Sequence, residues 1–300
     1  MMNKHLYRIH YALLLLTDLF ISSFVIAQGN NSKSISLNVE GYGETAMVKN
    51  NDGYAINNPH LLVGAEYVWK NGWSIFGELE YENAVDVTQL FVQKSLIDWL
   101  AVRLGKMTVP IGMANIYDNP MNHFTVTLPS EELAVLPTEC NLMGVSFLGS
   151  VKRCNYEVYA LSGNDCLAVA LRAENTSVNN LRIAASGYFD GKFIVSMDLE
   201  FNSHSFVARS VTTYSQQNKA IQTTVEAGYN IFQLMPKYNG SIFAFAHYEY
   251  AHSIYNSHRA TIGINYRPKS QIIAKMELSN RFSSNRQNME FAIGIGVVIP

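Results

Sequence analysis

Two short clusters in the sequence combine residue types that can do acid–base or metal chemistry. His247, Glu249 and His252 carry imidazole and carboxylate groups of the kind that bind transition metals, and Ser257-His258 places a hydroxyl beside an imidazole. On a strand, His247 and Glu249 share one face while His252 lies on the other, which disfavours a shared metal ion. Both clusters are more simply interpreted as polar pairs facing a polar interior.

Motifs of common catalytic and cofactor sites are absent from the sequence. It contains no Gly-x-Ser-x-Gly, no His-Glu-x-x-His, no Walker loop and no Gly-x-Gly-x-x-Gly opening a helix. Cys140, Cys154 and Cys166 follow no zinc or Cys-x-x-Cys spacing, and at least one of them must stay unpaired within the chain. Two interpretations of the cysteines remain open: two of them form a disulfide in an oxidising compartment, or all three are small apolar side chains. We predict no catalytic residue, no metal and no cofactor, and therefore a protein that is not an enzyme.

The N-terminus has the order of a secretory signal peptide. Lys4 and Arg8 precede an apolar stretch that ends at Ala27, so cleavage before Gln28 would leave 28–300 as the mature chain. A retained membrane helix is disfavoured, because Asp18 interrupts the stretch and a span needs roughly 20 apolar residues. We expect export and removal of residues 1–27.

The composition favours a membrane protein built from strands. Beyond the N-terminus no apolar run reaches the roughly 18 residues of a membrane helix. Charged residues make up only 15% and aromatic residues 12% of the chain, against roughly 25% charge in typical soluble domains. A barrel with an apolar outer wall has this composition. The formal net charge of −2 gives no basic surface for nucleic acid, and no linker divides 28–300, so we expect one domain.

Apolar and polar residues alternate through many segments of about ten residues, the length of a tilted membrane strand. The clearest are 73–82 and 193–202, where large apolar side chains occupy one face and Ser, Asp or Glu the other. The pattern continues through 259–279 and 289–299, and the last strand could close a barrel. The polar face would line the lumen, and the predicted lumen-wall residues are Glu78, Glu80, Arg103, Lys106, Asp198, Glu200, Arg259, Arg267, Lys275 and Glu277.

Turn residues separate these segments, as in Asn71-Gly72, Asp190-Gly191 and Asn239-Gly240, and indicate antiparallel hairpins. We predict an all-β fold, a closed antiparallel transmembrane β-barrel of about 14 strands, with 12 or 16 left open because bacterial barrels use even numbers. A soluble β-sandwich or solenoid is the alternative, but its strands would average only about 5 to 6 residues.

One connection, 110–141, departs from the hairpin rhythm. It is far longer than the roughly 12 to 15 residues at which loops become unusual, and it contains Pro110, Pro120, Pro129 and Pro137. Unpaired backbone at membrane depth must lie inside the protein. The loop either enters the lumen as a constriction or stays at the surface. The constriction candidates are Asp118, His123, Glu131, Glu132 and Glu139.

The sequence before this loop, with Arg103, Gly105-Lys106, Pro110 and Gly112, resembles the Arg-x-Gly-Lys…Pro-hydrophobic-Gly stretch of the phosphate-selective porin O and P family. The stretches Pro-Ser-Glu-Glu at 129–132 and Pro-Thr-Glu at 137–139 also look like that family's next loop, so the resemblance covers about 89–163. It implies a water-filled barrel, a homotrimer, through which small solutes diffuse.

Two features set the chain apart from that family or from its phosphate-selective members, and a third concerns the residues that do match. Between Ile111 and Met143 there is no Lys or Arg, so the family's phosphate-binding residues cannot be carried over. The chain ends in Val298-Ile299-Pro300 instead of an aromatic residue. Arg103 and Lys106 match the motif but lie on opposite faces of an ideal strand unless a bulge intervenes.

These observations predict an outer-membrane porin that lets small hydrophilic solutes or ions diffuse passively. Rates would depend on pore width and on the charge of the lumen wall. The expected partners are outer-membrane lipid, the solutes and two further copies of the chain, in the bacterial cell outer membrane. The alternative is a non-conducting barrel with a structural or surface-interaction role. The sequence fixes neither the solute nor the ion selectivity.

Overall fold

The computed structural model describes residues 35–299 except 52, 58, 127–134, 137–140, 164–166, 235–239, 253–255 and 284–285. The predicted signal peptide, residues 1–27, lies outside the described residues. The strands are β1 (Ser36–Asn50), β2 (Gly53–Ile56), β3 (His60–Val68), β4 (Trp73–Tyr81), β5 (Val85–Ile97), β6 (Leu100–Thr108), β7 (Asn141–Val151), β8 (Cys154–Ser162), β9 (Leu167–Asn175), β10 (Leu181–Phe189), β11 (Phe193–Asn202), β12 (Phe206–Ser215), β13 (Ala220–Asn230), β14 (Ser241–His252), β15 (Ser257–Lys269), β16 (Ile272–Ser283) and β17 (Arg286–Ile299).

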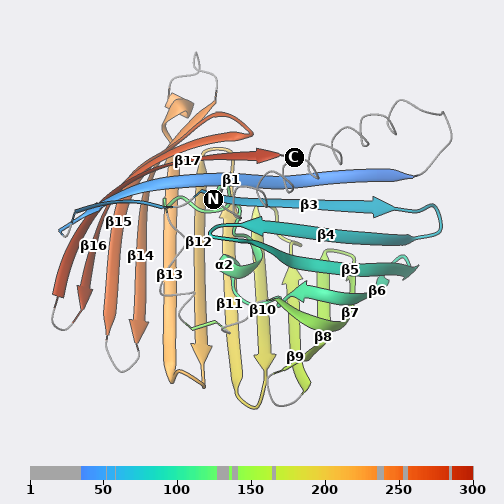
Figure 1. Ribbon diagram of the computed structural model, residues 1–300. Coiled ribbons are helices and arrows are strands. Elements are labelled where there is room, and N and C mark those ends of the chain that lie inside the picture. The colour runs from blue at the N-terminus through green and yellow to red at the C-terminus, as the bar shows by residue number, and fades with distance from the viewer. Residues whose placement is uncertain are drawn as a thin grey trace, which may run out of the picture.

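The strands form one closed antiparallel barrel (Figure 1). From β3 onward each strand pairs with the next, and β17 returns to pair with β1, with Ile299 opposite Gly41. β2 and β3 both pair with the same edge of β1, so together they fill one position in the wall. The 17 strands therefore make a barrel of 16 strand positions. This confirms the predicted closed barrel. The number of strand positions, 16, is the upper of the even numbers left open by the sequence and not the predicted 14.

Some hairpin turns carry no glycine or proline that would mark them in the sequence. The β7–β8 turn is Lys152-Arg153, and Lys152 adopts a φ of 58°. Lys219, just before β13, adopts a φ of 48°. Lysine rarely occupies this left-handed region, so nothing in its residue type signals such a turn.

The alternation predicted for the strands is borne out by their burial. On β11, Val195 and Met197 are exposed on the outer surface, whereas Ser196 and Asp198 are buried inside. The outer surface is consequently apolar, and exposed tryptophans lie at the strand ends, at Trp69, Trp73 and Trp99. Among the described residues no helix is long and apolar enough to cross a membrane.

Candidate functional site: the lumen and its inserted loop

The described part of the long β6–β7 connection lies inside the barrel. After Thr108 the chain turns inward, and Val109 and Ile111 are fully buried against Met107 and Leu161 of the wall. A one-turn helix, α2 (Met113–Ile116), follows, and Figure 1 shows it within the barrel. Of the two placements left open by the sequence, the lumen is therefore correct for residues 109–126 and 135–136.

Residues 121–126, the latch segment, are bound to the opposite wall by their backbone. Two carboxylates accept its N–H groups: Glu226 accepts from Phe124 at 3.3 Å, and Glu277 accepts from Val126 at 2.6 Å. Because these oxygens and N–H groups are buried together, each hydrogen bond replaces one that water would otherwise make.

Basic and amide side chains bind the carbonyl groups of the same segment. Lys275 Nζ donates to the Thr125 carbonyl at 2.8 Å, and Arg267 donates to the Met121 carbonyl at 3.0 Å. Asn265 Nδ2 donates to the Phe124 carbonyl at 3.3 Å. The wall thus supplies the cations that the loop lacks, which explains how a loop without Lys or Arg is held inside.

The ring of Phe124 anchors the latch segment in an aromatic socket. It is fully buried and stacks on Phe245, with ring centroids 5.5 Å apart, while Phe243 lies 5.3 Å away. Gly228 forms the floor, since a Cβ there would come within 2.4 Å of Phe124. The guanidinium of Arg209 stands 5.5 Å from the ring centroid. The socket therefore fits a flat aromatic side chain over a glycine.

A belt of ion pairs crosses the inner wall from β9 to β16. Each charged side chain lies near an opposite charge, as in Arg209–Glu226 at 2.6 Å between the adjacent strands β12 and β13, and Arg172 of β9 reaches Asp198 of β11 at 2.6 Å. The belt comprises Arg172, Glu174, Arg182, Asp198, Glu200, Arg209, Glu226, His247, Glu249, Arg259 and Glu277. Most of these charges are compensated by a partner within the belt, and two of its carboxylates, Glu226 and Glu277, bind the latch segment.

Nine of the ten predicted lumen-wall residues face the interior. Four of them, Asp198, Glu200, Arg259 and Glu277, belong to the belt. The exception is Lys106. It is in register with Leu90, whose side chain is exposed on the outer surface, and no bulge separates it from Arg103. The assignment of Lys106 to the lumen wall is thus wrong, because an odd spacing on a regular strand reverses the face. The other interior residues are Glu78, Glu80, Arg103, Arg267 and Lys275.

The described constriction candidates, Asp118 and His123, both lie in the lumen. Glu131, Glu132 and Glu139 lie outside the described residues. Cys140 and Cys166 do as well, and Cys154 is a free thiol within the described chain.

One of the two clusters first singled out for chemistry, His247 with Glu249, is the expected polar pair facing the interior, whereas for Ser257-His258 that expectation is wrong, because His258 lies on the outer face of its strand. His247 hydrogen-bonds to Glu249 at 3.1 Å inside the barrel. His252 is exposed on the other face, and His258 contacts Tyr248 on the outer surface. Among the described residues, no three His, Cys, Asp or Glu side chains are arranged to hold a metal ion.

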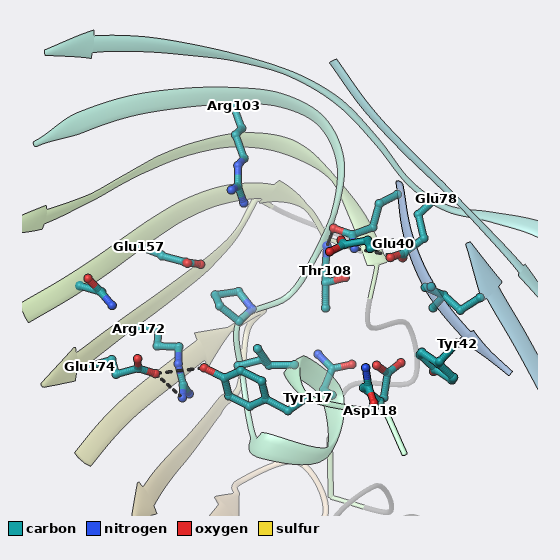
Figure 2. A pocket seen from close by; sticks show the side chains of 18 of the residues that line it. Glu40, Tyr42, Glu78, Arg103, Thr108, Tyr117, Asp118, Glu157, Arg172 and Glu174 are labelled. Carbon is teal, nitrogen blue, oxygen red and sulfur yellow. Dashed lines mark hydrogen bonds and ion pairs between the residues drawn. The ribbon is translucent and has the colours of Figure 1, made fainter. Parts of the chain in front are cut away.

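A water-accessible cavity of about 600 Å³, the Tyr42 cavity, remains between the loop and the wall (Figure 2). The loop contributes Pro110 and Asn115 to Asn119, and strands between β1 and β9 together with the end of β17 contribute the rest. Five carboxylates and two guanidiniums line it: Glu40, Glu78, Asp118, Glu157, Glu174, Arg103 and Arg172. Arg172 is already paired with Asp198, so the uncompensated charge of the cavity is negative.

A second cavity of about 330 Å³, the His60 cavity, continues the first along the same strands. On β1, residues 40–42 line the Tyr42 cavity and residues 44–46 the His60 cavity. On β4, Glu78 lines the first cavity and Glu80 the second, and Glu82, just after the strand, lines the second as well. Lys275 and His60 are its basic groups, and His60 lies 2.8 Å from Glu80 and 3.5 Å from Glu44. The two cavities thus follow one acidic strip past the loop.

Sequence reasoning missed the β1 part of this strip. Glu40, Tyr42 and Glu44 face inward, whereas Gly41 and Gly43 occupy the outward positions. Glycines gave the outer face no apolar stripe, so the usual alternation was hidden. The carboxylate–aromatic–carboxylate repeat at every second residue was the available signal.

Burial changes the ionisation of the two described loop candidates. It raises the pKa of Asp118 to about 6, although the nearby Tyr42 hydroxyl favours the charged form. Burial lowers the pKa of His123 well below its ordinary value. Within the described part of the chain, neither ring nitrogen of His123 has a hydrogen-bond partner. Asp118 is therefore a partly titrating carboxyl near neutral pH, and His123 is a neutral imidazole.

His123 should make the latch weaker in acid. Lys275, Arg209, Glu226 and His247 surround it, and its burial excludes the charged form. In a released loop its pKa would return to about 6.5. The latch is then fully stable above about pH 6.5 and loses about 1.4 kcal/mol for each unit below. We expect larger or noisier single-channel currents at pH 5 than at pH 7, and a much smaller pH effect in His123→Leu. Identical pH profiles for both proteins would refute this role.

The barrel is similar in fold to solved outer-membrane proteins, porins among them. A loop-deletion form of OmpT, an outer membrane protein of Vibrio cholerae, has a TM-score of 0.66 at 11% identity, covering 89% of this chain and 100% of that one. An anion-selective porin from Comamonas acidovorans has a TM-score of 0.63 at 11% identity, with the same coverage. A mutant of Rh. blastica porin has a TM-score of 0.64 at 10% identity, covering 88% and 100%. At these identities the likeness shows the fold alone.

Sequence comparison adds little. No family model matches the chain, so the phosphate-selective porin O and P family remains a resemblance over about 89–163. An uncharacterized protein of Aquifex aeolicus (strain VF5) is 21% identical over 243 residues, which are 63% of this chain and 55% of that relative. The chain thus spans about half the length of that curated relative.

Proposed function

We propose that this protein is a porin of the bacterial outer membrane through which small hydrophilic solutes diffuse, with a preference for cations over anions. The observation that carries the proposal is the acidic strip that continues through both cavities beside the latched loop. The apolar outer surface suits contact with lipid. Diffusion needs no catalytic group, and a homotrimer and removal of residues 1–27 are parts of the same proposal.

The cation preference follows from the charged side chains that form no ion pair within the described part of the barrel and can therefore meet a passing solute. The basic groups of the far wall are engaged: Lys275 and Arg267 bind loop carbonyls, and Arg209 bridges Glu200 and Glu226. The carboxylates Glu40 and Asp118, in contrast, face the open cavity. Rings of acidic side chains favour cations in pores. Phosphate would be repelled along this strip.

Liposome swelling tests diffusion directly. Vesicles containing the refolded mature chain should swell in isotonic solutions of small neutral sugars, with rates that fall steeply as the sugar grows, because the loop narrows the lumen. Vesicles with heat-denatured protein provide the background. Folded and inserted protein that gives only background swelling with every sugar would favour the non-conducting structural barrel.

A further inference from the structure

The Tyr42 cavity contains acceptor groups that form one small cluster on β1, β4 and the loop. Gly64 of β3 pairs with Glu40 on one side and with Glu78 on the other, so these carboxylates flank a glycine that the ring of Phe76 covers. Asp118 approaches the same place from the loop, next to Tyr42 (Figure 2). Three elements therefore bring three carboxylates to one end of the cavity.

Tyr42 gives an independent sign that this cluster is built for a ligand. Its side chain is 5% exposed, and its hydroxyl makes no hydrogen bond of normal distance and angle in the described chain. Buried tyrosine hydroxyls usually find a partner. The hydroxyl lies near enough to Asp118 to favour its charged form, and the residue lines the cavity. A ligand entering the cavity could complete its hydrogen bonding.

The carboxylates of the cluster are positioned to bind a ligand and are not paired with one another. Glu78 is fixed by hydrogen bonds from Thr88 at 2.7 Å and Gln89 at 3.0 Å, both to Oε1. These donors leave its second oxygen for another partner. Glu40 is exposed to the lumen. The cluster therefore offers several acceptor oxygens at one end of the cavity. The nearest basic group there is His60, whose ring lies 5.2 Å from that of Tyr42 and which is already paired with Glu44 and Glu80.

We infer that Glu40, Glu78, Asp118 and the Tyr42 hydroxyl form a binding site for a primary ammonium group, so that amine-bearing organic cations are preferred permeants. An ammonium has three N–H donors that can reach separate acceptors. A bare metal ion fits less well, since no three described acidic or imidazole side chains converge tightly enough to hold one. The cavity volume of about 600 Å³ is large enough for a small organic molecule. The inference deepens the proposed porin function and rests on it.

The test compares two dications that differ in N–H donors. Hexamethylenediamine carries two primary ammonium groups, whereas hexamethonium has the same chain with quaternary groups. We expect the diamine to block K⁺ current through the refolded mature chain at concentrations at least about tenfold lower, the scale of a charge-assisted hydrogen bond. Asp118→Asn and Tyr42→Phe should each remove most of that difference. Glu157→Gln, which neutralises a carboxylate of the same cavity away from the cluster, should keep it.

Calorimetric titration of the detergent-solubilised protein with both dications tests the ammonium site separately from the porin function. Diamine binding lost in Asp118→Asn and Tyr42→Phe supports the site whether or not current flows. K⁺ current with equal block by both dications, and equal heats, would overturn the ammonium site and leave the porin intact. Inserted protein without K⁺ current that still binds the diamine selectively would overturn the porin and keep the site.

Discussion

Replacing Phe124 by alanine should release the latch segment and raise single-channel conductance severalfold. The ring is fully buried between Phe243 and Phe245, and removing a buried phenyl side chain costs about 3 to 5 kcal/mol. The barrel itself should remain folded, because Phe124 belongs to no strand of the wall. The loss is therefore confined to the contact between loop and wall. Planar-bilayer recordings of the refolded variant measure it.

Gly228→Ala should disrupt the same contact between Phe124 and the barrel wall, this time by a change in the wall. The added Cβ would lie 2.4 Å from the Phe124 ring, a distance that forces the ring to move. Overpacking of this kind typically costs about 1 to 3 kcal/mol. Gly187→Ala is the matched control, since the nearest atom to its Cβ is Leu171 Cγ at 3.8 Å, an ordinary contact. If Phe124→Ala and Gly228→Ala fold and conduct like the wild type, the loop does not limit the pore.

Neutralising Glu40 and Asp118 together should lower the K⁺/Cl⁻ permeability ratio by roughly tenfold. Each unit charge within about 4 Å of a passing ion contributes on the order of 1 kcal/mol even in a watery lumen, and both residues line the Tyr42 cavity. The double variant Glu40→Gln/Asp118→Asn leaves Glu78, which is bound by wall side chains, in place. Reversal potentials in a KCl gradient give the ratio.

The matched control removes two carboxylates from exposed positions at the barrel ends. Asp86 is 75% exposed and Asp98 is exposed in the β5–β6 turn. Asp86→Asn/Asp98→Asn should leave the ratio within about twofold of wild type, because bulk water and salt screen such charges. An equal drop in both double variants would mean that net charge, and not the acidic strip, sets selectivity.

The fold could be predicted largely from local pattern. On β4 and β11 alternate side chains are apolar and exposed, because successive residues of a strand face the apolar outer surface and the polar lumen in turn. On β1 the apolar stripe is weaker, because its outward positions include Gly41 and Gly43. The predicted number of about 14 strands is lower than the 16 positions of the wall, and turns such as Lys152-Arg153 carry no glycine or proline to mark them.

The site could be predicted only in part, because the contacts that form it join residues far apart in the sequence. Val126 and Glu277 are 151 positions apart, and Lys275 reaches Thr125 across 150. Alternation placed Glu277 and Lys275 correctly on the inner face, but no local pattern says that they bind a loop backbone. Lys275 also lines the His60 cavity, and under the proposed function Glu40 and Tyr42 join the residues that meet the solute.

The most direct measurement is the single-channel current of the refolded mature chain in a planar bilayer with a KCl gradient. Our account predicts stable open steps whose reversal potential lies on the K⁺-selective side, because the passage beside the latched loop is lined by uncompensated carboxylates. An anion-selective reversal potential would contradict the acidic passage. The absence of steps from protein that is folded and inserted would contradict the porin itself.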